Sequence, residues 1–340
     1  MKRIQKLTKA PFLRHDGTIR SFMGDMLVVM PFLYAMPLFF YGFRVIKSLL
    51  ISIIFCYGSD MLCYRVKKGK FDFSDMSALI TASLIPLMLP ASVESWVIMV
   101  AAVFAILVAK HPFGALGNNP FNPAAVGFCF VAISWPEKVF SFTKPGVWLN
   151  VFGKIGEDVK IVNTMADSLM NNGRPFTKAM DIFSGNHAGA MGVTCIIVLL
   201  ACAGFLLYRK TINYQIPLGV VVGIAVTAFL FPRITTGRFE SIWFELTSGM
   251  AIFGALFLAT EPVTSPKHPY AKLIYGFLIG IGTMLFRFYG KMENCLPFAL
   301  LIVNSLTPFL DKIGMAIDSY VDRGFRKEKT IKSAGGAKNA

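Results

Sequence analysis

The chain contains 340 residues, of which 55% are hydrophobic and 14% aromatic, and its mean hydropathy is +0.59. This composition is far more apolar than that of a soluble domain, and it predicts an all-α polytopic membrane protein. The formal net charge of +15 does not indicate nucleic-acid binding, because the basic residues form no stripe interleaved with aromatic residues on a soluble domain.

Ten hydrophobic segments are predicted to form about ten transmembrane helices, five on each side of a long polar loop. Several contain about 16 residues, fewer than the ~20 that a straight span requires, so tilted, broken or re-entrant helices are expected. The segments are 25–42, 44–66, 76–91, 93–110, 121–135, 189–208, 214–232, 243–260, 272–289 and 294–311.

Basic clusters predict the orientation of these helices. Residues 65–70, 209–210 and 267–272 fall on the same side as both termini, whereas the long loop is nearly balanced in charge. By the positive-inside rule this side is cytoplasmic. The predicted parts are a cytoplasmic N-terminal segment (1–24), a first five-helix repeat (25–135), an extracytoplasmic loop (136–188), a second five-helix repeat (189–311) and a basic cytoplasmic tail (312–340).

Matched landmarks indicate that the two groups of five helices are repeats. The fourth segment of each group ends in a cation, Lys110 or Arg287, and the fifth begins at Pro-Phe, at residues 120–121 or 297–298. Both pairs of landmarks are separated by the same number of residues. An odd number of spans inverts the topology of the second repeat, so we expect a site between two inverted repeats, near the membrane midplane.

Residues 110–127, between the fourth and fifth segments, are rich in proline, glycine and asparagine. Interrupted backbone is tolerated at membrane depth only inside protein or beside a polar cavity. The stretch therefore predicts a turn at a functional site, with a surface loop as the alternative. Asn119 and Asn122 are expected to bond unpaired backbone groups. Gly117 and Gly127 are expected to allow unusual backbone geometry or close helix approach.

The remaining polar residues carry weaker signals. Asp75, Glu245, Glu261 and Glu293 lie at segment ends, where solvated or capping roles are the default expectation. The six cysteines are expected to be buried as small apolar side chains, and the four histidines show no metal-ligand spacing. No nucleotide-binding loop or nucleophile elbow is found, so a free-standing catalytic module is not predicted.

Several motifs resemble one family of membrane proteins. The run Leu116-Gly-Asn-Asn-Pro-Phe-Asn-Pro-Ala-Ala-Val-Gly127 is similar to a motif of the D subunit of Rnf-type ion-translocating oxidoreductases, and to one in the B subunit of the sodium-translocating NADH:quinone oxidoreductase. The resemblance extends from about residue 8 to about residue 315. Further similar motifs are Asp75-x-Ser-Ala-Leu-Ile-Thr81, Ser248-Gly-Met250, Thr260-Glu-Pro-Val-Thr-Ser-Pro266 and Leu306-Thr-Pro-x-x-Asp311.

The resemblance implies a non-autonomous, flavin-carrying subunit of a redox-driven ion translocase, which couples ferredoxin and NAD chemistry to export of Na⁺ or H⁺. It implies other membrane and peripheral subunits as partners, and a bacterial or archaeal cytoplasmic membrane as the location. A flavin (riboflavin or FMN) can be held noncovalently among the helices in this family. Candidate residues for such contact are Lys110, Asn119, Asn122 and Arg287; for Lys110 and Arg287 the alternative is stabilisation of a helix C-terminus.

In the same family an FMN is also esterified to a threonine of the extracytoplasmic loop, and here the chain departs from the pattern. Its loop reads Asn163-Thr-Met-Ala-Asp-Ser-Leu169, so that Asp167 stands where the resemblance places the flavin-bearing threonine. A carboxylate does not provide the hydroxyl oxygen of the phosphodiester, and its charge repels a phosphate. Covalent FMN is therefore not expected. Two alternatives stay open: a paralogous subunit of another membrane electron-transfer route, and a solute channel or transporter with a similar repeat.

Overall fold

Every one of the ten predicted segments contains a helix. The computed structural model describes residues 19–68, 76–114, 117–152, 161–234, 237–290, 292 and 294–336. Within these residues the only β-type pairing is an isolated bridge between Thr143 and Ile161. Four helices are long and apolar enough to cross a membrane, a bent pair forms a fifth candidate span, and shorter apolar helices accompany them. The protein is an all-α, multi-pass membrane protein, as predicted.

The first half begins with two long helices joined by a tight turn. Gly42 in this turn has a φ of +71°, a conformation that glycine adopts without steric cost. The helix α1 already begins at Ile19, earlier than the expected boundary at residue 25. The helices of this half are α1 (Ile19–Tyr41), α2 (Arg44–Lys68), α3 (Ser77–Met88), α4 (Ser95–Phe104), which continues as the π-helix η1 (Ala105–Lys110), and α5 (Pro123–Ser134).

Three short helices, α6 (Pro136–Val139), α7 (Met165–Met170) and α8 (Ala179–Ser184), lie in the long loop between the halves. The segment after α8 forms backbone hydrogen bonds with the first half. The backbone N–H groups of Met191 and Gly192 donate to the carbonyl oxygens of Leu89 and Leu87, at 3.0 and 2.8 Å. This segment therefore covers the end of α3, and the next helix begins at Ile196 rather than at residue 189.

The second half contains a broken span at its third position. Helices α11 and α12 are bent relative to each other by 65°, and Gly249 at the break has a φ of +55°. This break agrees with the expectation that some spans are interrupted. The helices are α9 (Ile196–Tyr208), α10 (Gln215–Leu230), α11 (Arg238–Thr247), α12 (Ala251–Phe253), which continues as the π-helix η2 (Gly254–Leu258), α13 (Pro269–Tyr289) and α14 (Leu296–Gly336).

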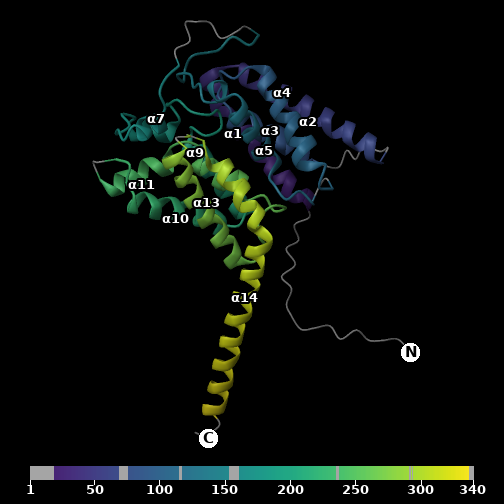
Figure 1. Cartoon of the computed structure of the whole chain (residues 1–340), viewed down its shortest axis with the longest axis vertical. Helices are drawn as coiled ribbons and strands as arrows, with labels where there is room; N and C mark the ends of the chain where they lie inside the picture. Colours follow the sequence, from purple (N-terminus) through teal and green to yellow (C-terminus); the bar gives the residue numbers. More distant parts are fainter. Residues whose placement is uncertain are drawn as a thin grey trace.

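Helix α14 is the longest element and projects away from the other helices (Figure 1). It continues without a break past residue 312, where the sequence predicts the start of the basic tail. The described part of this tail is therefore a helical continuation of the fifth span.

Helices α10 and α13 pack with their backbones in close approach. A Cβ atom added to Gly223 would lie 2.5 Å from the carbonyl oxygen of Phe277, and one added to Gly280 would lie 2.5 Å from that of Val220. Glycines four residues apart on both helices remove the side chains that would keep the two backbones apart. This contact packs α10 directly against α13.

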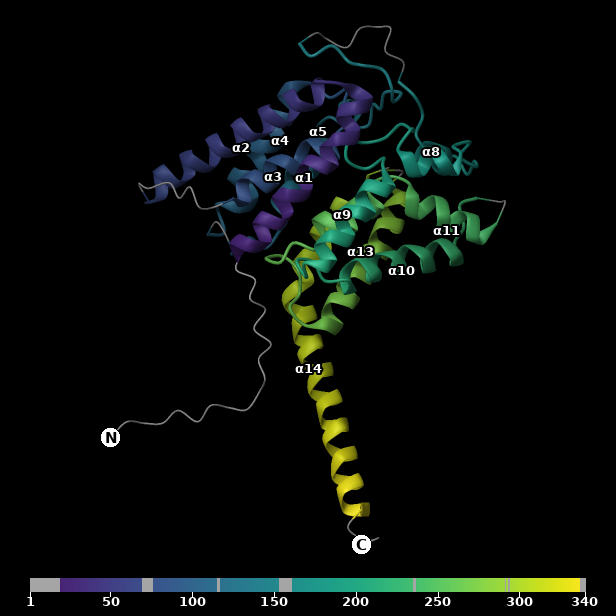
Figure 2. The ribbon, with the colours of Figure 1, turned by 180° about the vertical axis from the view of Figure 1, so that it is seen from behind.

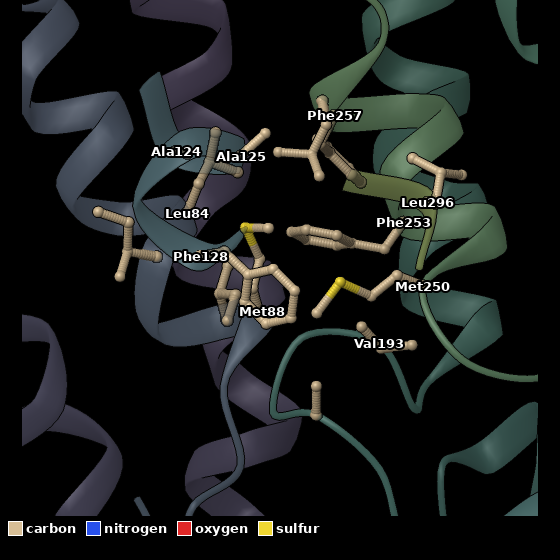
Figure 3. Close-up of a cluster of buried hydrophobic side chains, with 14 of the residues drawn as sticks. Leu84, Met88, Ala124, Ala125, Phe128, Val193, Met250, Phe253, Phe257 and Leu296 are labelled. Carbon is tan, nitrogen blue, oxygen red and sulfur yellow. The ribbon is translucent and has the colours of Figure 1, made fainter. Parts of the chain in front are cut away.

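Figure 2 shows the two halves side by side, with α1 to α5 in one group and α9 to α13 in the other. Apolar side chains fill the space between them. Figure 3 shows Leu84, Met88 and Phe128 of the first half facing Met250 and Phe253 of the second. All five are at most 5% exposed. We call these five residues the central apolar cluster. Within a membrane, van der Waals packing of such side chains, rather than their removal from water, favours contact between helices, so the cluster contributes to the contact between the halves.

Candidate functional site

The proline- and asparagine-rich stretch forms a turn that ends in helix α5. Asn122 is the N-cap of this helix, and its side-chain oxygen accepts a hydrogen bond from the backbone N–H of Ala125 at 3.1 Å. Pro123 occupies the first helical position, where no N–H donor is needed. The amide nitrogen of Asn122 donates to the carbonyl oxygen of Leu258 at 3.1 Å. One side chain therefore caps α5 and connects it to the end of η2 in the other half.

Asn119 makes a second connection between the halves. Its amide nitrogen donates to the carbonyl oxygen of Phe121 at 3.3 Å and to Oε1 of Glu261 at 3.4 Å. Asn119 is 6% exposed and Asn122 is 3% exposed. The alternative of a surface loop is therefore wrong for this part of the stretch, and the expected bonds from the asparagines to backbone groups are confirmed.

The two glycines have the roles that the sequence predicts. Gly117 has a φ of +89°, which a side chain would strain. A Cβ atom added to Gly127 would lie 2.5 Å from the carbonyl oxygen of Ala101 and 3.0 Å from Cβ of Ala105. Gly127 thus permits the close approach of α5 to α4.

The turn forms one wall of a cavity of about 630 Å³ between the two halves. We call it the inner cavity, because its lining residues come from the helix ends that are predicted to face the cytoplasm. Part of the lining is apolar and part is polar, with more cations than carboxylates. Its principal side chains are Phe22, Ile80, Leu84 and Phe257; Ser77, Thr81, Asn119, Asn122 and Asn213; Lys110, Arg209, Lys210 and Lys267; and Asp25 and Glu261.

Lys110 lines the inner cavity and also belongs to a buried ion pair. Its Nζ lies 3.0 Å from Oδ1 of Asp60, an oxygen that also lies 2.7 Å from Nε2 of His111. Lys110 is 2% exposed, His111 3% and Asp60 0%. A buried carboxylate requires such partners, because an isolated charge is very unfavourable away from water. Asp60 was not among the residues predicted from the sequence, although a carboxylate within an apolar helix is itself a signal.

Arg287 lies in a different cluster and does not line the inner cavity. Its Nη1 lies 2.7 Å from Oε2 of Glu245, and Nε of Arg233 lies 2.6 Å from Oε1 of the same residue. All three residues are at most 7% exposed. The structure therefore brings Lys110, Asn119 and Asn122 together and places Arg287 apart. The expected solvated role of Glu245 is wrong, because its carboxylate is buried between two guanidinium groups.

Glu261 is the half-buried carboxyl on the cavity wall. It accepts hydrogen bonds from Asn119 and, through Oε2, from the Thr264 hydroxyl at 3.2 Å. Removal from water raises the pKa of Glu261 to about 7, and the two hydrogen bonds partly oppose this rise. The other cavity carboxyl, Asp25, instead forms an ion pair with Arg209 at 3.1 Å.

Asp167 lies outside the inner cavity and has a structural role of its own. It is the third residue of α7, and its Oδ2 accepts from the backbone N–H of Thr164 at 2.8 Å. The Thr164 hydroxyl in turn accepts from the backbone N–H of Asp167 at 3.2 Å. This reciprocal arrangement is a capping box, which satisfies otherwise unpaired helix donors. The candidate site of covalent modification is thus a helix N-terminus.

Two of the carboxylates considered in the sequence, Asp75 and Glu293, lie outside the described residues. Within the described part of the chain, no group of three or more His, Cys, Asp or Glu side chains could hold a metal ion. The six cysteines are free thiols, and five of them are buried, whereas Cys63 is partly exposed.

Comparison with known proteins indicates one family. The NQR2, RnfD, RnfE family matches residues 6–316. The D subunit of the ion-translocating oxidoreductase complex of Haemophilus ducreyi is 28% identical, over 90% of this chain and 96% of that protein. The D subunit of the same complex from Alcanivorax borkumensis is 30% identical, over 80% and 84%. The D subunit of the proton-translocating ferredoxin:NAD(+) oxidoreductase complex of Clostridium ljungdahlii is 26% identical, over 92% and 95%.

Proposed function

The chain belongs to the NQR2, RnfD, RnfE family and is a membrane subunit of an ion-translocating complex, and from this premise we propose that its inner cavity holds a flavin noncovalently. The complex that we propose is of the ferredoxin:NAD type, driving export of Na⁺ or H⁺, because a relative of that name aligns over nearly the whole chain. The observation that carries the flavin proposal is the composition of the inner cavity.

The size and lining of the inner cavity fit a flavin. Ligand pockets in proteins commonly measure about 300–1,000 Å³ and combine apolar walls with a few polar groups. The cavity of about 630 Å³ has both. Phe22, Ile80 and Phe257 offer apolar surface to a ring system. Asn119 offers an amide to the ring's polar edge, and Lys110 offers positive charge.

When bound, the flavin would supply electron-transfer chemistry that no side chain of this protein provides. The chain's own contribution is to bind and orient the group, and to exclude water from it. Asn122 shapes the wall by holding α5 against η2. Lys110 lines the cavity as a cation and is paired with Asp60, which does not line it. These roles require both halves, so the site exists only in the assembled bundle.

We propose that the chain carries no covalent FMN. The carboxylate of Asp167 is occupied in the capping box with Thr164. The Thr164 hydroxyl accepts the backbone N–H of Asp167, so this nearby hydroxyl is also engaged.

The central apolar cluster argues against the alternative of a solute channel between the halves. Met88, Phe128 and Phe253 fill the space that such a channel would use (Figure 3). Membership of the family likewise supports a subunit of an electron-transfer complex.

The flavin proposal is tested on the complex purified in mild detergent. Acid extraction of the intact complex should release noncovalent riboflavin or FMN in a fixed ratio to this chain, and other membrane and redox subunits should copurify. Asn122→Leu should lower the flavin content, whereas Asn171→Leu, at an exposed amide outside the inner cavity, should not. A wild-type chain that releases no flavin, and takes up neither riboflavin nor FMN, would refute the proposal.

A further inference from the structure

The inner cavity contains two carboxyl groups in opposite electrostatic situations. Asp25 accepts from the guanidinium of Arg209 at 3.1 Å and from the hydroxyl of Thr211 at 2.7 Å. Glu261 accepts from two neutral donors, the amide of Asn119 and the hydroxyl of Thr264. A carboxylate that is paired with a cation holds its charge, whereas one that is partly removed from water and bonded only to neutral donors is more easily protonated.

The groups that face Glu261 come from three elements. The turn before α5 contributes Asn119, and the loop after η2 contributes Thr264. Helix α13 contributes Tyr275, which interacts electrostatically with Glu261 and whose hydroxyl donates to Asn304 Oδ1. The cations that line the cavity are Lys110, Arg209, Lys210 and Lys267. Within the described residues, no ion pair within 4.0 Å connects any Lys or Arg to Glu261.

We infer that Glu261 is the carboxyl through which the inner cavity exchanges a proton with its bound redox ligand. The inference rests on the proposed flavin. With the flavin bound, Glu261 in its acid form would donate one proton to a ring nitrogen when two electrons arrive from a partner iron–sulfur or flavin subunit. The O–H bond of Glu261 breaks and an N–H bond forms. Glu261 becomes a carboxylate, and water at the cavity mouth returns its proton.

The charges around the cavity fit this exchange. Two electrons and one proton leave the ligand with one additional negative charge. The four cations that line the cavity outnumber Asp25 and Asp60, the carboxylates paired with Arg209 and Lys110, and this excess of positive charge favours the added negative charge electrostatically. Glu261 in the acid form adds no negative charge before electrons arrive. Its pKa of about 7 keeps both the acid and the carboxylate accessible near neutral pH, as a proton-exchanging group requires.

The first experiment uses flavin-free protein and follows the carboxylic acid C=O stretch by infrared spectroscopy between pH 5 and 9. The wild type should show a titration near pH 7. Glu261→Gln should abolish it, and Glu137→Gln, at an exposed carboxyl outside the cavity, should leave it unchanged. A wild type without this titration would overturn the inference, whether or not flavin binds.

The second experiment measures the midpoint potential of bound flavin against pH. The wild type should show a change of slope near pH 7 that Glu261→Gln removes. Thr264→Val removes one donor that favours the carboxylate, so it should move the change of slope to higher pH. This variant also serves if Glu261→Gln fails to fold. An identical slope in wild type and both variants would overturn this inference alone, whereas a wild type that binds no flavin would overturn the proposed function with it.

Discussion

Two buried carboxylates, one in each half of the protein, are each balanced by cations. Asp60 carries no exposed surface and balances Lys110, and Glu245 carries none and balances Arg287 and Arg233. Removal of one partner from a buried pair leaves an uncompensated charge, which costs about 3–5 kcal/mol. Such a loss is a large fraction of the stability of a typical domain.

We therefore expect Asp60→Ala and Glu245→Ala each to lower thermal stability in detergent, and to reduce the amount of protein in the membrane. The matched control is Glu94→Ala, whose partner Lys138 is 42% exposed in its side chain; an exposed pair contributes only about 0–1 kcal/mol. Melting by intrinsic fluorescence measures all three. Equal melting temperatures for Asp60→Ala and Glu94→Ala would contradict the structural role of the buried pair.

A further prediction concerns Asp167, which stands where the family resemblance places a flavin-bearing threonine: the chain should carry no covalent flavin. After denaturation the wild-type chain should show no flavin fluorescence, even when a flavin transferase is coexpressed. Asp167→Thr combined with Ser168→Pro should restore labelling if the loop still accepts the cofactor. The proline removes only one long backbone bond, from Ser168 N–H to the Thr164 carbonyl at 3.4 Å. A wild-type intact mass increased by one FMN would refute the expected absence.

At the scale of helices, the pairing of α4 with α5 depends on one glycine. The Cβ of any larger residue at 127 would collide with the backbone carbonyl of Ala101, and rotation of a side chain cannot relieve a clash with backbone. Overpacking of this kind typically costs about 1–3 kcal/mol, occasionally more.

Gly127→Val should accordingly reduce accumulation of the protein and its assembly into the complex. Gly204→Ala in α9 is the control, because no atom lies within 4 Å of an added Cβ there. Membrane levels by immunoblot and copurification of partner subunits measure the effect. Wild-type values for Gly127→Val would show that α4 and α5 can separate without consequence.

The positions of these helices could be predicted from the sequence, whereas most of the contacts between them could not. Hydrophobic length placed all ten segments, and the breaker residues pointed to Asn119 and Asn122, which line the inner cavity. Pairing across helices was not predictable, because Asp60 and Glu245 carry no local sign of which neighbour will balance them. Arg287 was grouped with Lys110 because both end a fourth segment. The structure separates the two into different clusters.

At the scale of the whole molecule, the distribution of charge predicts how the protein lies in the membrane. The inner cavity contains four cations from helix ends and loops. The start of α1 and the far end of α14 lie toward the same side of the molecule in Figures 1 and 2. We propose that this side faces the cytoplasm, as the positive-inside rule indicates.

Cysteine labelling in intact cells tests the orientation. Lys144→Cys, in the loop before α7, should react with a membrane-impermeant maleimide, whereas Lys210→Cys, between α9 and α10, should react only after the membrane is opened. Both residues are exposed in the structure, so accessibility within the protein does not limit either reaction. The unmodified chain measures the background from native thiols. Labelling of both positions from the same side would overturn the topology.

The two asparagines that join the halves also line the inner cavity. Binding of a ligand in this cavity is therefore coupled to the stability of the contact between the halves. A ligand that binds only when Asn119 reaches Glu261 and Asn122 reaches Leu258 stabilises the joined state by mass action. At a hundredfold excess over its dissociation constant, it adds about 2.7 kcal/mol. Chains without the proposed flavin would lack this contribution, so their halves would separate more often and expose the central apolar cluster. The cell's membrane proteases could therefore remove unloaded subunits before they enter a complex.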